Sequence, residues 1–567
     1  MTSSTIPAMS PAELRQLDHE FEQGVEKLEL LQVDLETALV NFLPAAENYC
    51  RNHVKAGLQE AESAINAARV GLFWIFKKCQ QSAGSAPRQI DPALIDQAFR
   101  LLMAADEYWK VWNIMSMCFD KKNMPKVAEA RRIGTSEVHV NMLDPNAHRK
   151  SITDNLCHDK FGPDNQAVTK LLTTFFERHI KDLISEANPS EKSQTEIEYT
   201  MPVNFYKKLA GFVNNAYDSV WLLPEDWQFG QYTLKQLRLT WEALICICLS
   251  HSQLIGDTKY WNSLTLTKSK ADWVTLLHDI CGVEERRIQS IVSHLTFDPS
   301  TAPSPDDVPR LPFRSLANGD LILSPYQTLM CHAENVVWRL LTVIEPALHS
   351  VLSTQKESVQ LSELRTDLAN RTSLTLKDMS NNRIVVPSTN GNAKTDIDLV
   401  LVDRIDRFGL ILQLKWTAPP MVMKNMQTVY TDLRDGIRQA EESLAWLRED
   451  PVRLTKHISI EHDLARKFQF EALVVGKHNM GMSRLGKTTV PVINETILRW
   501  YLLDRRASLR ETWDSIMKNL YFAQEGTHYQ LTDLEATFNG IKLFGDKLSS
   551  RFLPNRFGPD SLGIAKA

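Results

Sequence analysis

The residues of this chain best suited to chemistry lie in one short stretch, TDIDLVLVDRIDRFGLILQLKW, at positions 395–416. Asp396 and Asp398 precede an apolar run. Gln413 and Lys415 end a second apolar run, which follows a short polar turn. The two runs predict a β-hairpin that is buried on both faces. Because its strands bring their outer ends to one edge of the sheet, the stretch predicts a cluster of two carboxylates, one amide and one amine.

The register of this hairpin decides whether the polar groups meet. With the turn centred between residues 405 and 407, antiparallel pairing sets Asp398 opposite Lys415. Directly opposed residues share a face of the sheet, and so do residues two apart on one strand. We therefore expect Asp396, Asp398, Gln413 and Lys415 on one face, whereas a slip of one residue would scatter them.

A divalent cation would explain why such polarity lies beside a covered sheet. Burying these groups costs on the order of several kcal/mol unless something pairs them. Mg²⁺ prefers carboxylate, amide and carbonyl oxygens, so the cluster suits this cation, with Mn²⁺ as an alternative. The competing interpretation is that the acids at the strand entrance and the lysine at the strand exit simply face water.

The segments around the hairpin predict an α/β domain with the element order α-β-β-β-α-β-β. Apolar residues recur at helical spacing through the long helix after the hairpin, and charges fill its other face, so this helix is expected to lie on the sheet. The expected elements are a helix over 355–370, a strand over 382–388, the hairpin over 396–415, the long helix over 424–448, and strands over 470–476 and 488–493.

The pattern D-x-D followed by two apolar residues, a turn, two further apolar residues and Q-x-K resembles the core of the PD-(D/E)xK, or restriction-endonuclease-like, nucleases. It is most similar to the Mrr-like branch, in which glutamine replaces the acid before x-Lys. The resemblance covers roughly residues 350–500 and implies an α-β-β-β-α-β core. Ile397 stands before Asp398 where the motif nominally has proline.

The resemblance implies a role for each residue of the cluster. Asp398 would be the principal metal-binding carboxylate, and the Gln413 side chain and Leu414 carbonyl would be further ligands. Lys415 would orient or help deprotonate the attacking water and offset charge on the phosphate. Asp396 would be an additional ligand or a neighbouring acid. Because Gln413 carries no charge, the metal would be held more weakly, which leaves open an inactive form of the fold.

The family fold also carries a glutamate on its first helix. Leu361, Leu364 and Leu368 mark the buried face of the expected helix, and Glu357 lies on that face, four residues before Leu361. Glu363 projects elsewhere, so Glu357 is the preferred match. The alternative is that Glu357 is an ordinary solvated residue. Gln439, on the long helix, stands where Mrr-like proteins often have glutamine.

The rest of the chain is expected to be mostly α-helical. Residues 12–40 carry one apolar stripe, which predicts a long helix that packs in its own chain or binds a partner. A Pro-rich linker precedes an Asn318-Gly319 pair, which predicts a hairpin with a type I′ turn. The expected domains are helical regions over 1–190 and 191–297, a linker, hairpin and helix over 298–350, the nuclease-like domain over 351–520, and a C-terminal extension over 521–567.

Composition narrows the class of protein. The 567 residues carry a net charge of −5, but residues 351–520 hold 25 basic against 21 acidic residues, which is compatible with a polyanionic substrate. The eight cysteines form no CxxC pair, which favours reduced thiols in a cytoplasm. The apolar stretches fall short of the ~20 residues that span a bilayer, so no membrane association is expected.

Two functions are consistent with the sequence. The first is a Mg²⁺-dependent DNA endonuclease, with RNA as an open alternative substrate and the N-terminal helices sensing a signal, binding a protein partner or self-associating. In joining a helical region to such a domain, the chain resembles prokaryotic restriction and anti-phage defence proteins. The second function is a catalytically inactive nuclease fold that binds nucleic acid or acts as a scaffold.

Overall fold

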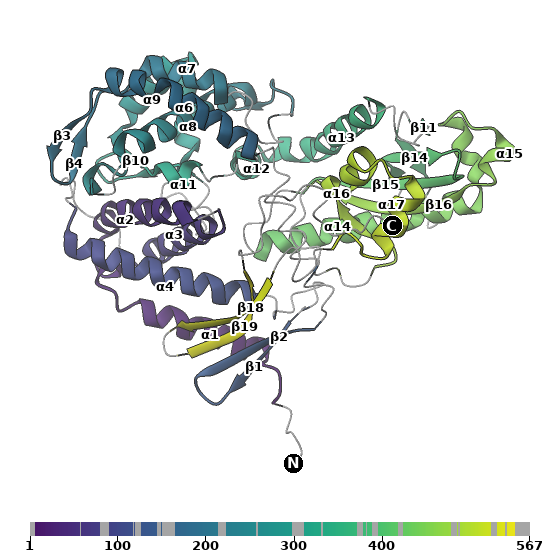
Figure 1. Cartoon of the computed structure of the whole chain (residues 1–567), viewed down its shortest axis with the longest axis horizontal. Coiled ribbons are helices and arrows are strands. Elements are labelled where there is room, and N and C mark those ends of the chain that lie inside the picture. Colours follow the sequence, from purple (N-terminus) through teal and green to yellow (C-terminus); the bar gives the residue numbers. More distant parts are fainter. Residues whose placement is uncertain are drawn as a thin grey trace.

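Figure 1 shows the computed structural model of the chain, with helical bundles on one side and an α/β region on the other. The described part of the chain is rich in helices and contains several small sheets. None of the described helices is both long enough and apolar enough to cross a bilayer. The structure describes residues 6–549 except 57, 80–89, 117, 119–125, 127, 144–148, 150–164, 214–220, 222, 257–258, 298–310, 330, 332, 371–377, 381–382, 388–394, 418–422, 478–484, 486–487, 523–529 and 539–540.

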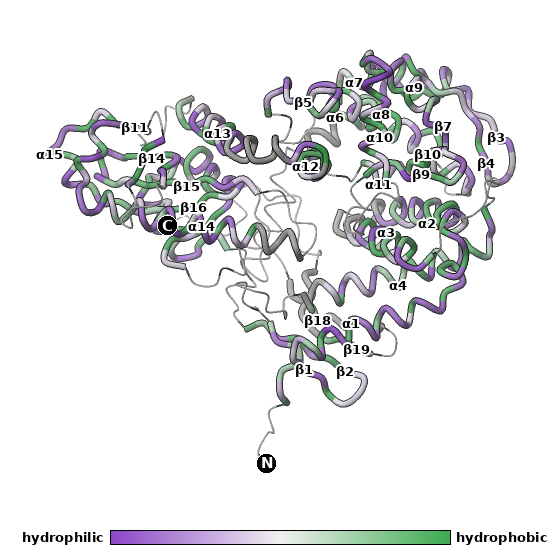
Figure 2. Tube along the Cα trace, turned by 180° about the vertical axis from the view of Figure 1, so that it is seen from behind, coloured by the Kyte–Doolittle hydropathy of each residue, from purple (hydrophilic) through white to green (hydrophobic). Residues whose placement is uncertain are grey.

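The N-terminal bundle packs around one core of buried aliphatic and aromatic side chains. Along its helices, hydrophobic and hydrophilic positions alternate, as expected for helices with one buried face (Figure 2). The single helix expected over residues 12–40 is wrong. Leu28 is extended, with ψ of 130°, and Asp34 Oδ1 accepts the Thr37 N–H at 3.0 Å, which starts a new helix. The bundle comprises α1 (Pro11–Val25), α2 (Leu35–Ala56), α3 (Leu58–Lys78) and α4 (Pro92–Ser116).

A second helical group packs around a core of its own. Its helices are α6 (Asn165–Ala187), α7 (Val203–Val213), α8 (Leu234–Ile255), α9 (Lys270–Cys281), α10 (Glu285–His294), α11 (Pro325–Leu329) and α12 (Ala333–Val343). A sheet with the order β7-β10-β9-β8 joins this group. Its strands are β7 (Leu266–Ser269), β8 (Thr296–Phe297), β9 (Phe313–Ser315) and β10 (Asp320–Leu323).

The hairpin predicted around Asn318 and Gly319 is confirmed as the pairing of β9 with β10. Its turn is not type I′, because only Gly319 of the pair has a positive φ, of 85°. The Gly319 N–H donates to the Leu316 carbonyl at 3.0 Å, so the turn is centred one residue earlier than predicted. The Pro-rich segment before this hairpin falls mainly on residues 298–310, which lie outside the described part of the chain.

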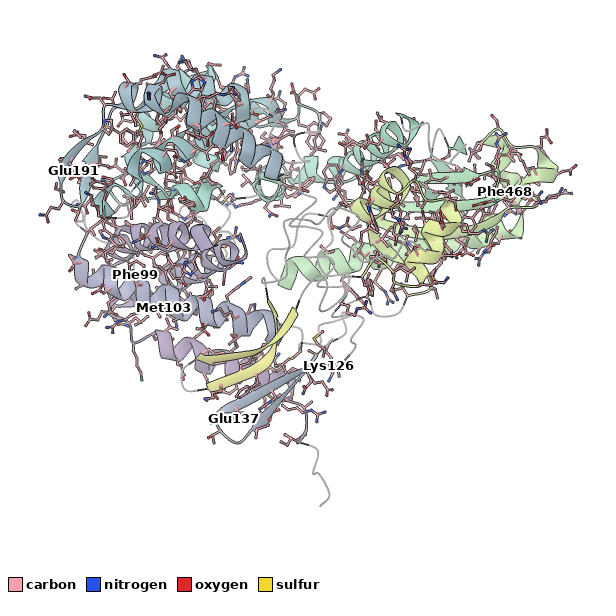
Figure 3. All side chains as sticks on the ribbon, viewed as in Figure 1. Phe99, Met103, Lys126, Glu137, Glu191 and Phe468 are labelled. Atoms are coloured by element: carbon pink, nitrogen blue, oxygen red, sulfur yellow. The ribbon has the colours of Figure 1, made fainter. Side chains whose placement is uncertain are left out.

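Strands far apart in the sequence share one sheet, with the order β1-β2-β19-β18. Strand β19 runs parallel to β2, and Lys542 is level with Glu137, which Figure 3 labels. Leu543 is fully buried in the core of the N-terminal bundle. The segment expected as a C-terminal extension therefore returns to the N-terminal part, as the yellow hairpin of Figure 1 shows. The strands are β1 (Ala128–Ile133), β2 (Glu137–Met142), β18 (Gln530–Phe538) and β19 (Ile541–Ser549).

The α/β region is built on a five-stranded sheet with the order β11-β14-β15-β16-β17. The first three strands are antiparallel, and β15, β16 and β17 are parallel. A separate two-stranded sheet pairs β12 (Ile384–Val386) with β13 (Thr395–Ile397). The central strands are β11 (Asp378–Met379), β14 (Leu399–Asp403), β15 (Phe408–Lys415), β16 (Gln469–Gly476) and β17 (Val492–Asn494).

Alternate residues of the central strands enter two separate cores. Val400 and Ile411 pack with α14 (Met423–Glu449) on one face. Leu399 and Leu412 pack with α13 (Pro346–Asn370) on the other, together with α16 (Glu495–Arg499) and α17 (Leu509–Met517). Because helices cover both faces, the strands are apolar on both sides, as predicted for the hairpin.

Individual elements match the expectations to different degrees. The long helix predicted over 424–448 is α14, and the strand predicted over 470–476 is β16, each within one residue of its bounds. The helix predicted from 355 begins at Pro346. The strand predicted over 382–388 shrinks to β12 and lies outside the central sheet, and the last strand is reduced to β17.

Candidate active site

The pairing of β14 with β15 differs by two residues from the predicted register. The observed pairs run from Leu399 with Leu412 to Asp403 with Phe408, so the same register continued places Asp398 level with Gln413 rather than with Lys415. The predicted pairing of Asp398 with Lys415 is therefore wrong. A shift of two residues leaves every side chain on its predicted face.

The turn of the hairpin explains the shift. Asp403 is fully buried, and its Oδ1 accepts the N–H of Ile405 at 2.9 Å and that of Asp406 at 3.2 Å. Arg407 closes the turn with a φ of 50°. This local side-chain capping places the turn over residues 404–407, one position before the predicted centre.

Asp398 lies at the bend between β13 and β14 and is 2% exposed. Its Oδ2 accepts the Leu414 N–H at 2.8 Å, so the carboxylate takes the place of a backbone acceptor beside β15. Burial raises the pKa of Asp398 to about 7; the Arg383 guanidinium and the Leu414 N–H oppose this rise, while Glu357 and Asp396 add to it.

Two buried oxygens at this point make no hydrogen bond with the described residues. They are Oδ1 of Asp398 and Oε1 of Gln413, whose residue is 1% exposed. Buried polar atoms are nearly always hydrogen-bonded. Gln413 Oε1 therefore calls for a partner, whereas Asp398 Oδ1 has an ion-pair contact with Arg383 Nε at 3.1 Å. Gln439, on α14, also has a buried Oε1 without a hydrogen bond to the described residues.

Lys415 lies in a narrow space between α13 and α14. Its side chain is 13% exposed, and its Nζ is 3.7 Å from Glu357 Oε1. A Cβ at Gly436 of α14 would lie only 3.1 Å from Lys415 Cε and 3.2 Å from its Cγ. The absence of a side chain at Gly436 therefore lets α14 pass this close to the lysine.

Glu357 and Glu363 of α13 point to different clusters. Glu357 faces the hairpin end, where it contacts Lys415. Glu363 Oε2 instead accepts a bond from Lys477 Nζ at 2.8 Å, in an ion network with Glu495 on the other core's side. Burial raises the pKa of Glu495, and Lys477 opposes that rise. Each charge in this second network has a described partner, so we interpret it as structural.

Arg383, which was not predicted from the sequence, contacts three carboxylates of the cluster. Its Nε is 3.1 Å from Asp398 Oδ1, its Nη1 is 3.5 Å from Asp396 Oδ2, and its Nη2 is 3.7 Å from Glu357 Oε2. The β12–β13 pairing, Ile384 with Ile397, brings Arg383 level with Asp398 when it is continued by one residue. Predicting that pairing would have revealed the arginine.

The donor set fits a hard divalent cation. The two oxygens without hydrogen bonds, from Asp398 and Gln413, are a carboxylate and an amide, which are ligand types that Mg²⁺ accepts. Among the described residues, no three His, Cys, Asp or Glu side chains are already arranged to hold a metal. Arg383 Nε, 3.1 Å from Asp398 Oδ1, is the positive group that faces this oxygen.

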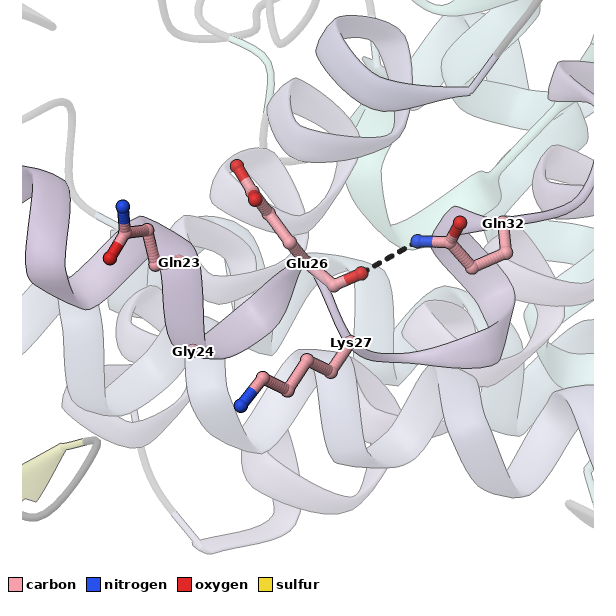
Figure 4. Close-up of a pocket in the computed structure, with 5 residues that line it drawn as sticks. All are labelled: Gln23, Gly24, Glu26, Lys27 and Gln32. Carbon is pink, nitrogen blue, oxygen red and sulfur yellow. Dashed lines mark hydrogen bonds between the residues drawn. The ribbon is translucent and has the colours of Figure 1, made fainter.

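The surface hollow drawn in Figure 4 belongs to the N-terminal bundle and not to the hairpin. Gln32 Nε2 donates to the Glu26 carbonyl at 2.7 Å on its rim. The hollow is open and is lined by residues of one local segment, Gln23, Gly24, Glu26, Lys27 and Gln32. It offers no convergence of acids and bases from different elements, so the hairpin end remains the candidate active site.

Comparison with known proteins adds no assignment: no family model, no curated protein and no solved structure matches this chain.

Proposed function

We propose that this chain is a metal-dependent endonuclease that hydrolyses the phosphodiester bonds of DNA. The observation that carries the proposal is the convergence of Asp398, Gln413, Lys415 and Glu357 at one end of a buried hairpin. Three separate segments supply these residues, and Oδ1 of Asp398 and Oε1 of Gln413 are buried without hydrogen bonds to the described residues. The resemblance of the hairpin motif to PD-(D/E)xK nucleases supports the same reaction.

The residues divide the work of phosphodiester hydrolysis. Asp398 and Gln413 would hold the cation, with the Leu414 carbonyl as a further ligand and Asp396 beside them. When bound, a divalent cation supplies Lewis acidity, which activates water and neutralises phosphate charge. Lys415, kept in place by Glu357 and by the close passage of α14, would orient the attacking water and stabilise the charge that develops on the phosphate.

Two acidic side chains lie near the Lys415 amine. Glu357 Oε1 lies 3.7 Å from the Lys415 Nζ. The second acid is Asp432 of α14: burial raises the pKa of Asp432, and the positive charges of Lys356 and Lys415 oppose that rise. An ammonium group suits electrostatic stabilisation of a phosphate better than it suits proton abstraction, so the former is the primary role that we propose for Lys415.

The larger setting of the proposal is prokaryotic restriction or anti-phage defence in the cytoplasm. The excess of basic residues over 351–520 is compatible with a nucleic-acid substrate. The helical part would sense a signal or bind a partner. Trp416, next to Lys415, is buried in the core of the second helical group, and its Nε1 donates to Glu334 Oε1 of α12 at 2.8 Å. This contact connects the helical part directly to the residue that follows Lys415 at the end of β15.

Cleavage assays with the purified full chain test the proposal. Supercoiled plasmid, linear duplex DNA, single-stranded DNA and RNA are each incubated with Mg²⁺, with Mn²⁺ or with EDTA. We expect plasmid nicking that requires the cation and that Lys415→Ala abolishes without loss of folding. Lys456→Ala, at an exposed lysine of the same region, is the matched control and should cut normally. Cutting of plasmid by Lys415→Ala at the wild-type rate would refute the proposal. Cutting of RNA alone would show that the substrate is RNA and not DNA.

The second candidate function is a catalytically inactive nuclease fold that binds nucleic acid or serves as a scaffold. The contacts of Arg383 with three carboxylates favour it, because a guanidinium already neutralises the charge that a cation would neutralise. Calorimetric titration of the wild-type protein with Mg²⁺ or Mn²⁺ separates the two functions. Heat of binding that Asp398→Asn removes supports the enzyme, and the absence of heat in both proteins supports the scaffold.

A further inference from the structure

Arg383 is held at the hairpin end less firmly than a structural arginine would be. Its Nε and Nη2 are buried but make no hydrogen bond with the described residues, although each lies near a carboxylate. Charge-assisted hydrogen bonds of arginine normally measure about 2.7–2.9 Å and are often paired. The contacts here are 3.1, 3.5 and 3.7 Å and reach three carboxylates, Asp398 and Asp396 of one segment and Glu357 of α13. The guanidinium thus makes one long hydrogen bond, from Nη1 to Asp396 Oδ2 at 3.5 Å, and lies beside Asp398 and Glu357 without a hydrogen bond to either.

The two oxygens of Asp398 differ in the same sense. Oδ2 accepts a well-formed bond of 2.8 Å from the Leu414 N–H, which fixes the carboxylate on the sheet. Oδ1 faces Arg383 without a hydrogen bond to the described residues. Gln413 Oε1, from the position level with Asp398, is equally without a hydrogen bond to them. The oxygens that a hard cation would use are therefore the ones that the protein leaves weakly engaged.

Arg383 is also placed so that it can leave. Its side chain is 27% exposed, and that of Asp396 is 35% exposed, whereas Asp398 is buried. The arginine side chain is thus partly open to solvent, although its Nε and Nη2 are buried. A long side chain at such a position can move its charged end into water while the aliphatic stem stays in contact with the protein. Movement of Arg383 would uncover Asp398 Oδ1 without moving β14 or β15.

We propose that Arg383 is a built-in competitor of the divalent cation, which holds Asp398, Asp396 and Glu357 together in the metal-free site and is displaced from Asp398 when the cation binds. This inference rests on the proposed metal-dependent function. In this view the affinity of the site for the cation depends on competition between the cation and the Arg383 guanidinium for the Asp398 carboxylate. Removing the guanidinium then strengthens cation binding, and a positive charge within about 4–6 Å of a carboxylate typically shifts its affinity for a cation such as a proton by tenfold or more.

A titration of the full chain with Mn²⁺, followed by calorimetry, tests this without any substrate. We expect Arg383→Met to bind Mn²⁺ about tenfold more tightly than the wild-type protein. Arg383→Lys keeps the charge on a group that cannot reach three carboxylates at once and should fall between the two. The matched control is Arg438→Met, because Arg438 also contacts two acids, Asp435 and Glu442, but on the exposed side of α14. It should bind Mn²⁺ as the wild-type protein does.

Thermal unfolding with and without Mn²⁺ supplies a second reading and reports whether each variant folds. We expect Mn²⁺ to raise the melting temperature more in Arg383→Met than in the wild-type protein. If Arg383→Met does not fold, Arg383→Lys decides the matter by the same comparison. Unchanged or weaker Mn²⁺ binding in the folded variants overturns the inference, and so does an equal gain in Arg438→Met.

The cleavage assay keeps this inference separate from the proposed function. If the wild-type protein cuts no nucleic acid but Arg383→Met binds Mn²⁺ more tightly, the competition between Arg383 and the cation is supported and the proposed nuclease function is refuted. If the wild-type protein nicks plasmid but Arg383→Met binds Mn²⁺ no more tightly than the wild-type protein, the nuclease function is supported and the competition between Arg383 and the cation is refuted.

Discussion

At the scale of single residues, the candidate site depends on where one lysine is held. Lys415 is confined by Glu357 on one side and by the backbone of α14 at Gly436 on the other. A methyl group at Gly436 would meet Lys415 Cε at 3.1 Å, which is closer than ordinary van der Waals contact. Placement of a catalytic group within fractions of an ångström matters, because misplacement by about 1 Å costs on the order of 100-fold in rate.

Gly436→Ala is therefore expected to lower the rate constant of DNA nicking by about tenfold while leaving the protein folded. Alanine favours helix by about 1 kcal/mol over glycine, which offsets part of the stability that the crowding costs. It does not restore the position of Lys415, which the added methyl group displaces. The matched control is Gly211→Ala on α7, where an added Cβ meets nothing within 4 Å. Single-turnover nicking and a melting curve separate the two effects, and full activity in Gly436→Ala would contradict this account of Lys415.

The chemistry of single residues was only partly predictable from the sequence. Asp398, Gln413 and Lys415 were expected at one sheet edge because strand alternation fixes faces even when the register is uncertain. The register itself was off by two, because Asp403 caps the turn through its side chain. Arg383 was missed because a pairing of two three-residue strands delivers it, and such short strands leave little pattern in a sequence.

At the scale of elements, length and periodicity decided what could be predicted. Helix α14 has 27 residues, and its regular apolar spacing located it within one residue at each end. Strands β12 and β17 have three residues each, too few for an alternation to mark their bounds. The apolar stripe of α1 continued past its end, so the sequence did not show the break before α2, although the Asp34 cap was a local signal for it.

Helix α8 carries a buried histidine that makes the second helical group sensitive to acid. His251 is 1% exposed; its Nδ1 lies 2.7 Å from the Tyr199 hydroxyl, and its Nε2 lies 3.3 Å from the Leu264 carbonyl. Burial lowers the pKa of His251 from 6.5 to about 3, and the nearby Arg51 adds to the effect. The imidazole therefore stays neutral in the folded protein at pH values where the unfolded chain protonates it.

The unfolded state binds more protons here, so the contribution of His251 to stability is present above pH 6.5 and is lost as the pH falls toward 3. The loss should reach about 2 kcal/mol by pH 5, at roughly 1.4 kcal/mol per pH unit. The difference in unfolding free energy between the wild-type protein and His251→Gln should therefore shrink between pH 7.5 and pH 5. Urea titrations at each pH measure it, and a constant difference would contradict the assignment.

At the scale of the whole molecule, residues 128–142 and 530–549 are joined in one sheet. The pairing of β19 with β2 links residues about 400 positions apart, and no local pattern in a sequence encodes a contact of that separation. The four-stranded sheet was accordingly not predicted, although each half of it is an ordinary hairpin. The C-terminal strands thus complete the N-terminal part, while the candidate site lies in the α/β region between them in sequence.

Leu543→Ala tests that arrangement. Leu543 is fully buried in the core of the N-terminal bundle, so its truncation should cost about 2–5 kcal/mol of stability. Amide hydrogen exchange should then rise in β1, β2 and the N-terminal helices, far away in sequence, and not in α14. Lys542→Ala, at the exposed neighbouring position, is the matched control and should change little. Faster exchange confined to residues 530–549 would show that the hairpin does not belong to this core.

The proposed DNA cleavage depends on Asp398 as the carboxylate that holds the cation. The most direct measurement compares plasmid nicking by the wild-type protein and by Asp398→Asn over a series of Mg²⁺ concentrations, with EDTA as the zero. Asparagine keeps the shape and the acceptor for the Leu414 N–H but removes the charge. We predict cation-dependent nicking by the wild-type protein and none by the variant at any Mg²⁺ concentration. Nicking by Asp398→Asn at the wild-type rate would contradict the account.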